Sequence, residues 1–149
     1  MAIIDRNDER ITRFFGLLLI AEAIACVFFA FAHLNPRIPL GFATLQEPLN
    51  IPAAIVETLC GIALTIGGVA LISRHPRAWL RALAGQFFTL GGFILGVIAV
   101  AANGGGDDDP VNNVFHRVML VLLVLGLLGS YTMLRREHGD THPVENGAA

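Results

Sequence analysis

The sequence contains little charge and no lysine. Charged residues make up only 15% of its 149 residues, and all ten basic residues are arginines. A soluble domain of this length normally carries more charge on its surface. The net charge of −2 also leaves no basic surface that would suit nucleic acid. These shortages argue against a soluble domain and against a nucleic-acid-binding protein.

Motifs for catalysis are also missing from the chain. It contains no Gly-x-Ser-x-Gly, no phosphate-binding loop, no His-Glu-x-x-His and no Cys-x-x-Cys. Membrane enzymes can work without such motifs, so their absence lowers the expectation of catalysis but does not remove it. We therefore expect a non-enzymatic protein that holds no cofactor.

Long apolar runs are what the sequence has in abundance. Four of them, separated by short polar stretches, cover residues 14–34, 51–72, 82–102 and 114–134. A helix rises about 1.5 Å per residue, so each run is long enough to cross the roughly 30 Å hydrocarbon layer of a bilayer. The sequence predicts an all-α protein, an antiparallel four-helix transmembrane bundle. This membrane domain would cover residues 1–136, and a disordered cytoplasmic tail would follow over residues 137–149.

The arginines predict how the bundle lies in the membrane. Eight of the ten lie in the N-terminal segment, in the connection between the second and third runs, and in the C-terminal tail: Arg6, Arg10, Arg13, Arg74, Arg77, Arg81, Arg135 and Arg136. Only Arg37 and Arg117 belong to the other two connections. Cytoplasmic loops are enriched in basic residues, so we expect both termini to be cytoplasmic.

Two carboxyl groups interrupt the apolar runs. Glu22 is near the middle of the first run and Glu57 is two turns into the second, and each is followed about one helical turn later by a cysteine, Cys26 or Cys60. A charged carboxylate at that depth costs about 3 kcal/mol, so it has to be protonated, paired or facing water. Counting about 1.5 Å per residue puts all four side chains close together near the midplane. Three interpretations stay open: a proton or cation site, structural hydrogen bonding between helices, and a metal site with two carboxylates and two thiolates.

A second polar cluster is expected at the outer rim of the bundle. It would combine the end of the first run with the beginning of the fourth and the loop before it: His33, Asp107, Asp108, Asp109, His116 and Arg117. Helix capping and interfacial hydrogen bonds are one use for these residues. The alternative is a haem or divalent metal held by two histidines, and the sequence does not identify a metal.

Small residues form stripes on two of the runs. Gly85, Gly92 and Gly96 recur on one face of the third run, and the last two form a GxxxG motif. Gly61 and Gly68 form a shorter stripe on the second run. Helices in lipid associate through such close-packing surfaces. We expect the stripes to face other helices, either within one bundle or across a homo-oligomer interface.

The segment Asn113-Val-Phe-His116, which opens the last apolar run, resembles a feature of the DUF4383 family. These are small four-helix bacterial membrane proteins without an assigned biochemical role, in which Asn-x-x-His tends to begin a helix. The length, the four spans and the basic connection before the third span are also similar. The chain departs from the family after Asn50, where it reads Ile-Pro-Ala and a similar histidine would be expected. The resemblance implies a fold and a location in the bacterial inner (plasma) membrane, but no activity.

These observations predict a small multi-pass membrane protein of unassigned role. It would be a non-enzymatic packing or accessory subunit. Its partners would be the lipid bilayer and either copies of itself or another membrane subunit. The alternative is a proton- or cation-coupled small-molecule transporter that uses Glu22 and Glu57. Small multidrug resistance transporters, which are similar in having four helices, also carry a membrane-embedded Glu in the first. A second alternative is a metal- or haem-binding membrane protein.

Overall fold

The computed structural model describes residues 6–42, 44–102 and 110–139. The order of elements is α1 (Arg6–Ala32), β1 (Ile38–Pro39), β2 (Thr44–Leu45), α2 (Ile51–Ile72), α3 (Ala78–Ala102) and α4 (Pro110–Gly139). All four helices of this part of the chain are long and apolar enough to cross a membrane. The prediction of an all-helical fold with four candidate membrane spans is confirmed.

Three of the four described helices begin before their apolar run or continue past it, although α1 ends at Ala32, two residues before the end of its run. α2 has the predicted bounds, but α3 begins four residues before residue 82 and α4 continues to Gly139. Residues 137–139 are therefore helical where we expected the tail to begin, and residues 140–149 lie outside the described part of the chain. An apolar run reports the part of a helix that suits lipid, whereas backbone hydrogen bonds can continue for several turns past it.

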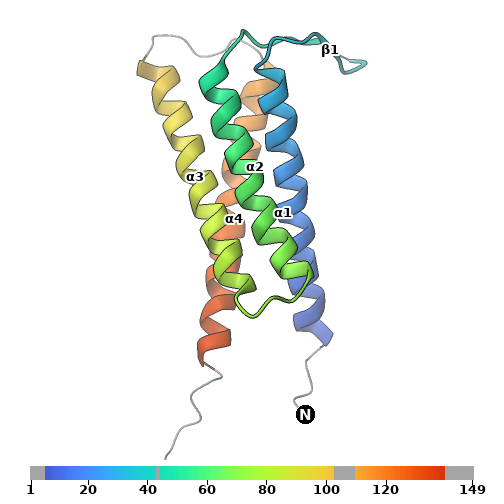
Figure 1. The fold of residues 1–149 in the computed structure, drawn as a ribbon, viewed down its shortest axis with the longest axis vertical. Coiled ribbons are helices and arrows are strands. Elements are labelled where there is room, and N and C mark those ends of the chain that lie inside the picture. Colours follow the sequence, from blue (N-terminus) through green and yellow to red (C-terminus); the bar gives the residue numbers. More distant parts are fainter. Residues whose placement is uncertain (1–5, 43, 103–109, 140–149) are drawn as a thin grey trace, which may run out of the picture.

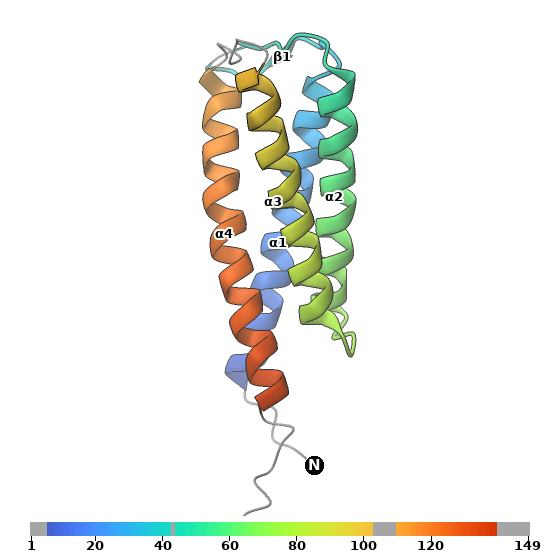
Figure 2. The ribbon, with the colours of Figure 1, turned by 90° about the vertical axis from the view of Figure 1, so that its left-hand side faces the viewer.

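Figure 1 shows the helices as long rods, with consecutive helices joined at alternating ends. The beginning of α1 and the end of α4 lie at one end of the bundle, and β1 lies at the opposite end. We call the end with β1 the hairpin end and the other the terminal end. In the turned view of Figure 2, α3 diverges from α2 toward the hairpin end.

The connection between α1 and α2 folds as a small antiparallel hairpin that the sequence did not predict. Ile38 pairs with Leu45 and Pro39 pairs with Thr44. The side chain of Leu45 is fully buried, and so is that of Glu47, two residues later. The Asn50 amide then donates a 2.9 Å hydrogen bond to the carbonyl oxygen of His33, which ties the beginning of α2 to the end of α1. The hairpin therefore covers the end of the first two helices.

Close backbone approach joins α1 to α2. A Cβ added at Gly68 would come within 2.9 Å of the Gly16 carbonyl oxygen, and one added at Gly61 within 3.2 Å of the Ala23 carbonyl oxygen. Residues later in α1 thus face residues earlier in α2, so these two helices run in opposite directions. Glycine at these positions lets the helices pack without an intervening side chain.

The glycine stripe of α3 faces α2 over only part of its length. A Cβ added at Gly85 would come within 2.6 Å of the Ala63 carbonyl oxygen, and one at Gly92 within 2.9 Å of the Cys60 sulfur. At Gly96 the added Cβ would meet nothing within 4 Å. The divergence of α3 from α2 in Figure 2 accounts for this open end of the stripe.

Candidate functional site

Glu22 faces the interior of the bundle. It is 2% exposed and shares the buried face of α1 with Leu19, Cys26 and His33, which recur at helical spacing. Both carboxyl oxygens are buried, and neither has a hydrogen-bond partner among the described residues. A buried polar group without a partner is costly, because it has lost its hydrogen bonds to water without replacement.

Glu57 of α2 has a partner in the interior. Its Oε1 lies 3.5 Å from the Nε2 of His33, and both side chains are buried. Side chains on a helix lean toward its N-terminus, so Glu57 leans toward the hairpin end and His33 leans away from it. The two groups meet between their helices. His33, which we expected to join His116 and Arg117, thus pairs with Glu57.

The two carboxyl groups share one interior but lie at different depths. Gly61 lies against the Ala23 carbonyl oxygen and the side chain of Val27, so Glu22 is nearer the terminal end than Gly61. Glu57 is four residues from Gly61 toward the hairpin end, which is about 6 Å along the helix. Glu22 and Glu57 also lean in opposite directions. The predicted patch of two carboxyls is therefore drawn out along the bundle axis.

The two cysteines lie between these levels. Cys26 and Cys60 are both buried and are free thiols. The hydroxyl group of Thr89 on α3 donates to the Gly85 carbonyl oxygen at 2.9 Å and to the Cys60 carbonyl oxygen at 3.4 Å. The contact links α3 to α2 at the same depth as the thiols.

A further buried polar pair was missed by the sequence analysis. The Ser130 hydroxyl of α4 donates a 2.8 Å hydrogen bond to the Oε1 of Gln86 on α3. Both side chains are fully buried, and Nε2 of Gln86 has no hydrogen-bond partner in the described structure. A signal was present, since both are polar residues inside apolar runs, but neither titrates and so neither stood out.

We call the buried polar side chains of the described helices and of the end of α1 the polar row: His33, Glu57, Thr89, Glu22, Gln86 and Ser130. Every member is buried, and the row begins under the hairpin and continues past the middle of the bundle. Toward the terminal end the buried neighbours are apolar, among them Leu71 and Trp79. The interior at the terminal end is thus apolar, whereas toward the hairpin end the polar row lies among apolar side chains such as Phe29 and Phe115.

The expected outer-rim cluster is only partly described. His116 is half-buried, and its ring lies 5.3 Å from both the Phe93 and the Phe115 rings. Arg117 is exposed. Asp107, Asp108 and Asp109 lie outside the described residues. Within the described ranges, no three His, Cys, Asp or Glu side chains are arranged to hold a metal ion, so the metal interpretation gains no support from this geometry.

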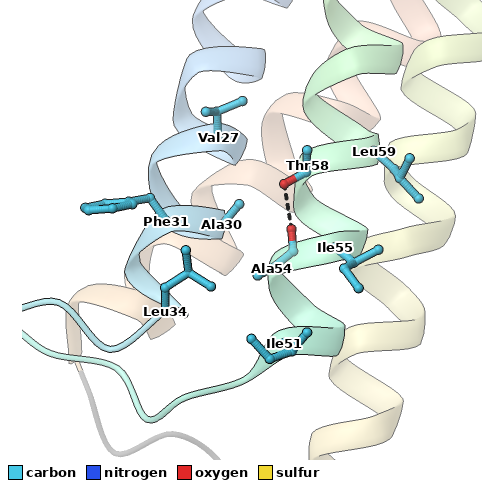
Figure 3. Close-up of a pocket in the computed structure, with 9 residues that line it drawn as sticks. All are labelled: Val27, Ala30, Phe31, Leu34, Ile51, Ala54, Ile55, Thr58 and Leu59. Atoms are coloured by element: carbon cyan, nitrogen blue, oxygen red, sulfur yellow. Dashed lines mark hydrogen bonds between the residues drawn. The ribbon is translucent and has the colours of Figure 1, made fainter.

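An apolar groove lies on the outside of the first two helices. It has a volume of about 420 Å³ and runs between α1 and α2 near the hairpin end, as Figure 3 shows. Ala30 and Ala54 are small residues between larger side chains such as Phe31 and Ile55. Its one hydroxyl group, on Thr58, donates to the carbonyl oxygen of Ala54 at 2.7 Å. None of the residues of the polar row lines this groove.

Comparison with known proteins adds no relative. No family model matches the chain, and neither curated proteins nor solved structures give a match. The resemblance to the DUF4383 family therefore stays a prediction. The functional argument rests on the geometry alone.

Proposed function

We propose that this chain is a proton-coupled carrier of the bacterial inner membrane, with Glu22 as the carboxyl group that takes up and releases the proton. The antiparallel bundle would cross the membrane four times, with the terminal end in the cytoplasm. The eight arginines of the terminal end support this orientation. Protons would approach from the hairpin end, where the polar row begins with His33 and Glu57.

The burial of Glu22 without a partner carries this proposal. A carboxyl group with a purely structural role is expected to hydrogen-bond a neighbouring helix. Both oxygens of Glu22 lack such a bond in the described structure, although the side chain is only 2% exposed. Ionisable residues at membrane depth that face a bundle interior usually belong to proton or ion pathways. The neighbouring Glu57–His33 pair provides a second proton-binding group on the same row.

Infrared difference spectroscopy on the protein in lipid bilayers tests this function. A carboxyl group that gains a proton between high and low pH acquires a carboxylic acid carbonyl band. We expect one such band to vanish in Glu22→Gln, and proton uptake by liposomes containing the protein to vanish with it. Glu137→Gln, a change at an exposed carboxyl group of α4, is the matched control and should keep both signals. A spectrum unchanged by Glu22→Gln would contradict the proposal.

A second candidate function is assembly with a membrane partner. It is favoured by the open end of the α3 stripe, where Gly96 is exposed and flanked by the exposed Leu95 and Val97. Small residues on a lipid-facing surface allow another helix to approach closely. Energy transfer between labelled copies in vesicles tests this function with a second copy as the partner. Gly96→Leu should abolish the transfer and Val121→Leu on α4 should not, whereas equal transfer in both would count against a homo-oligomer.

A further inference from the structure

We propose that Gln86 is the positioning partner of Glu22, and that its side-chain amide rotates to match the protonation state of that carboxyl group. The amide would donate a hydrogen bond to the ionised carboxylate and accept one from the protonated acid. Ser130 would hold the amide in both orientations. This inference rests on the proposed function and deepens it, because it names the group that senses the proton.

The helix register brings the two side chains to one depth. A Cβ added at Gly67 would lie 2.9 Å from both the Leu19 Cδ2 and the Ala82 Cα, so these three residues form one layer. Glu22 is three residues beyond Leu19, and Gln86 is four residues beyond Ala82. Since α1 and α3 run in the same direction (Figure 1), each side chain lies one helical turn above that layer.

Both side chains are turned inward and have unused hydrogen-bonding capacity. Glu22 is 2% exposed and Gln86 is fully buried. Within the described residues, neither Oε1 nor Oε2 of Glu22 accepts a hydrogen bond, and Nε2 of Gln86 donates none. An unused acceptor and an unused donor at one depth of a lipid-surrounded interior are complementary.

The chemistry of the amide suits both protonation states. The structure shows the bond from Ser130 to the Oε1 of Gln86. In this orientation Nε2 is free to donate to the Glu22 carboxylate. After a half-turn, Oε1 can accept the proton of the Glu22 acid, and the Ser130 hydroxyl can accept from Nε2. Gly126 on α4 lies against the amide nitrogen, where any side chain would collide with Gln86. No bond is made or broken in Gln86, so the proton stays with Glu22.

Among the described residues, the other buried titratable groups near this site belong to α1 and α2. They are Cys26 on α1 itself and, farther toward the hairpin end, Cys60 and Glu57 on α2 with its partner His33. The described buried residues of α3 and α4 near Glu22 include no titratable side chain. A response of Glu22 to changes in α3 would therefore pass through a neutral side chain, and Gln86 is the one with an unused donor at the depth of Glu22.

A double-mutant cycle on the full chain tests the contact. Unfolding is measured in bilayer-like micelles for Glu22→Gln, Gln86→Met and the double variant. The two changes should be non-additive: the free energy of unfolding of the double variant should be no lower than that of the less stable single variant. Thr89→Val, which removes another buried polar group of α3, is the control and should be additive with Glu22→Gln.

The infrared titration of Glu22 supplies a readout that packing alone would not move. In Gln86→Met the pH midpoint of the Glu22 band should shift, whereas in Thr89→Val it should stay in place. Ser130→Ala, which removes only the anchor of the amide, should give the same shift to a smaller extent and covers the case in which Gln86→Met does not fold. Additive energies with an unmoved midpoint would overturn this inference while leaving the proposed function intact. Absence of any titrating Glu22 band would overturn the proposed function and the amide rotation together.

Discussion

The two helical hairpins of this bundle, α1–α2 and α3–α4, are built differently. In the apolar 18-residue stretch of each candidate span, 39% of the residues are buried in α1 and 44% in α2, compared with 28% in α3 and 22% in α4. The buried ionisable side chains of the described spans, Glu22 and Glu57, lie in the first hairpin, with His33 at its end. The buried polar side chains of the second are neutral: Gln86, Thr89 and Ser130. Groups that can carry charge thus lie where packing excludes lipid best.

The difference follows from how each hairpin is held. Gly61 and Gly68 bring α1 and α2 into backbone contact, so these helices leave little room for lipid between them. α4 meets α1 through aromatic rings, with Phe29 and Phe115 stacked at 3.6 Å between ring centroids. A hairpin with fewer buried residues is the one expected to move more easily. We infer that α3 and α4 respond to the state of Glu22, while α1 and α2 hold it in place.

The largest effect should come from breaking the buried Glu57–His33 pair of the first hairpin. His33→Leu leaves the buried Glu57 without its partner and should lower the free energy of unfolding by about 3 kcal/mol. Steric trapping in bilayers measures this free energy. The double variant His33→Leu with Glu57→Leu is the control and should recover most of the loss, because no carboxyl group is left alone. A double variant as unstable as the single one would show that the pair itself is not the cause.

A slightly smaller effect should come from separating the hairpins at α2 and α3. Gly85→Leu places a side chain against the Ala63 carbonyl oxygen, which cannot move away without shifting α2. We expect a loss of about 2 kcal/mol, typical of overpacking. Gly96→Leu adds the same side chain to the same helix in open space and should cost less than about 0.5 kcal/mol. Equal losses at the two positions would mean that α3 packs on α2 over its whole length.

The sequence predicted the helices well because their lengths are set by the membrane. The bounds of α2 were predicted correctly, since Asn50 caps the helix by accepting from the Ala53 amide at 3.1 Å and Pro52 suits its first turn. The start of α3 was missed, because the turn at Ala78–Arg81 is amphipathic and interrupts the apolar pattern. The β1–β2 hairpin was missed as well, because strands of two residues carry no recognisable alternation.

The candidate site was harder to predict than the fold. Periodicity identifies which face of α1 carries Glu22, but the rotation and register of four helices decide what that face meets. Counting residues along single helices grouped Glu22 and Glu57 with the two cysteines in one patch near the midplane, but could not say which side chains meet. The structure adds that Glu57 pairs with His33 and that Glu22 lies at about the depth of Gln86. Pairing across helices depends on packing that a single sequence does not display.

A smaller effect is expected from the neutral pair of the second hairpin. Ser130→Ala removes one hydrogen bond to Gln86, whose amide stays buried, and should cost less than about 1 kcal/mol, as is usual for polar contacts between membrane helices. The same unfolding measurement as for His33→Leu gives a direct comparison. Thr132→Ala, which removes an exposed hydroxyl two residues away, is the control and should change little. A loss equal to that of His33→Leu would remove the distinction between the two hairpins.

The smallest effect should come from the ion pair that joins the hairpins at the terminal end. Arg74, in the connection between α2 and α3, pairs with Glu9 of α1, and Glu9 also pairs with Arg13 at 3.0 Å. Arg74→Ala leaves Glu9 with its second partner, and the pair is partly exposed to water, so the loss should be about 0.5 kcal/mol and should shrink at high salt. Arg77→Ala, at an exposed arginine of the same connection, is the control. A loss several times larger, insensitive to salt, would show that this end of the bundle is held by charge and not by the apolar packing of Phe15 on Trp79, whose ring centroids lie 5.5 Å apart.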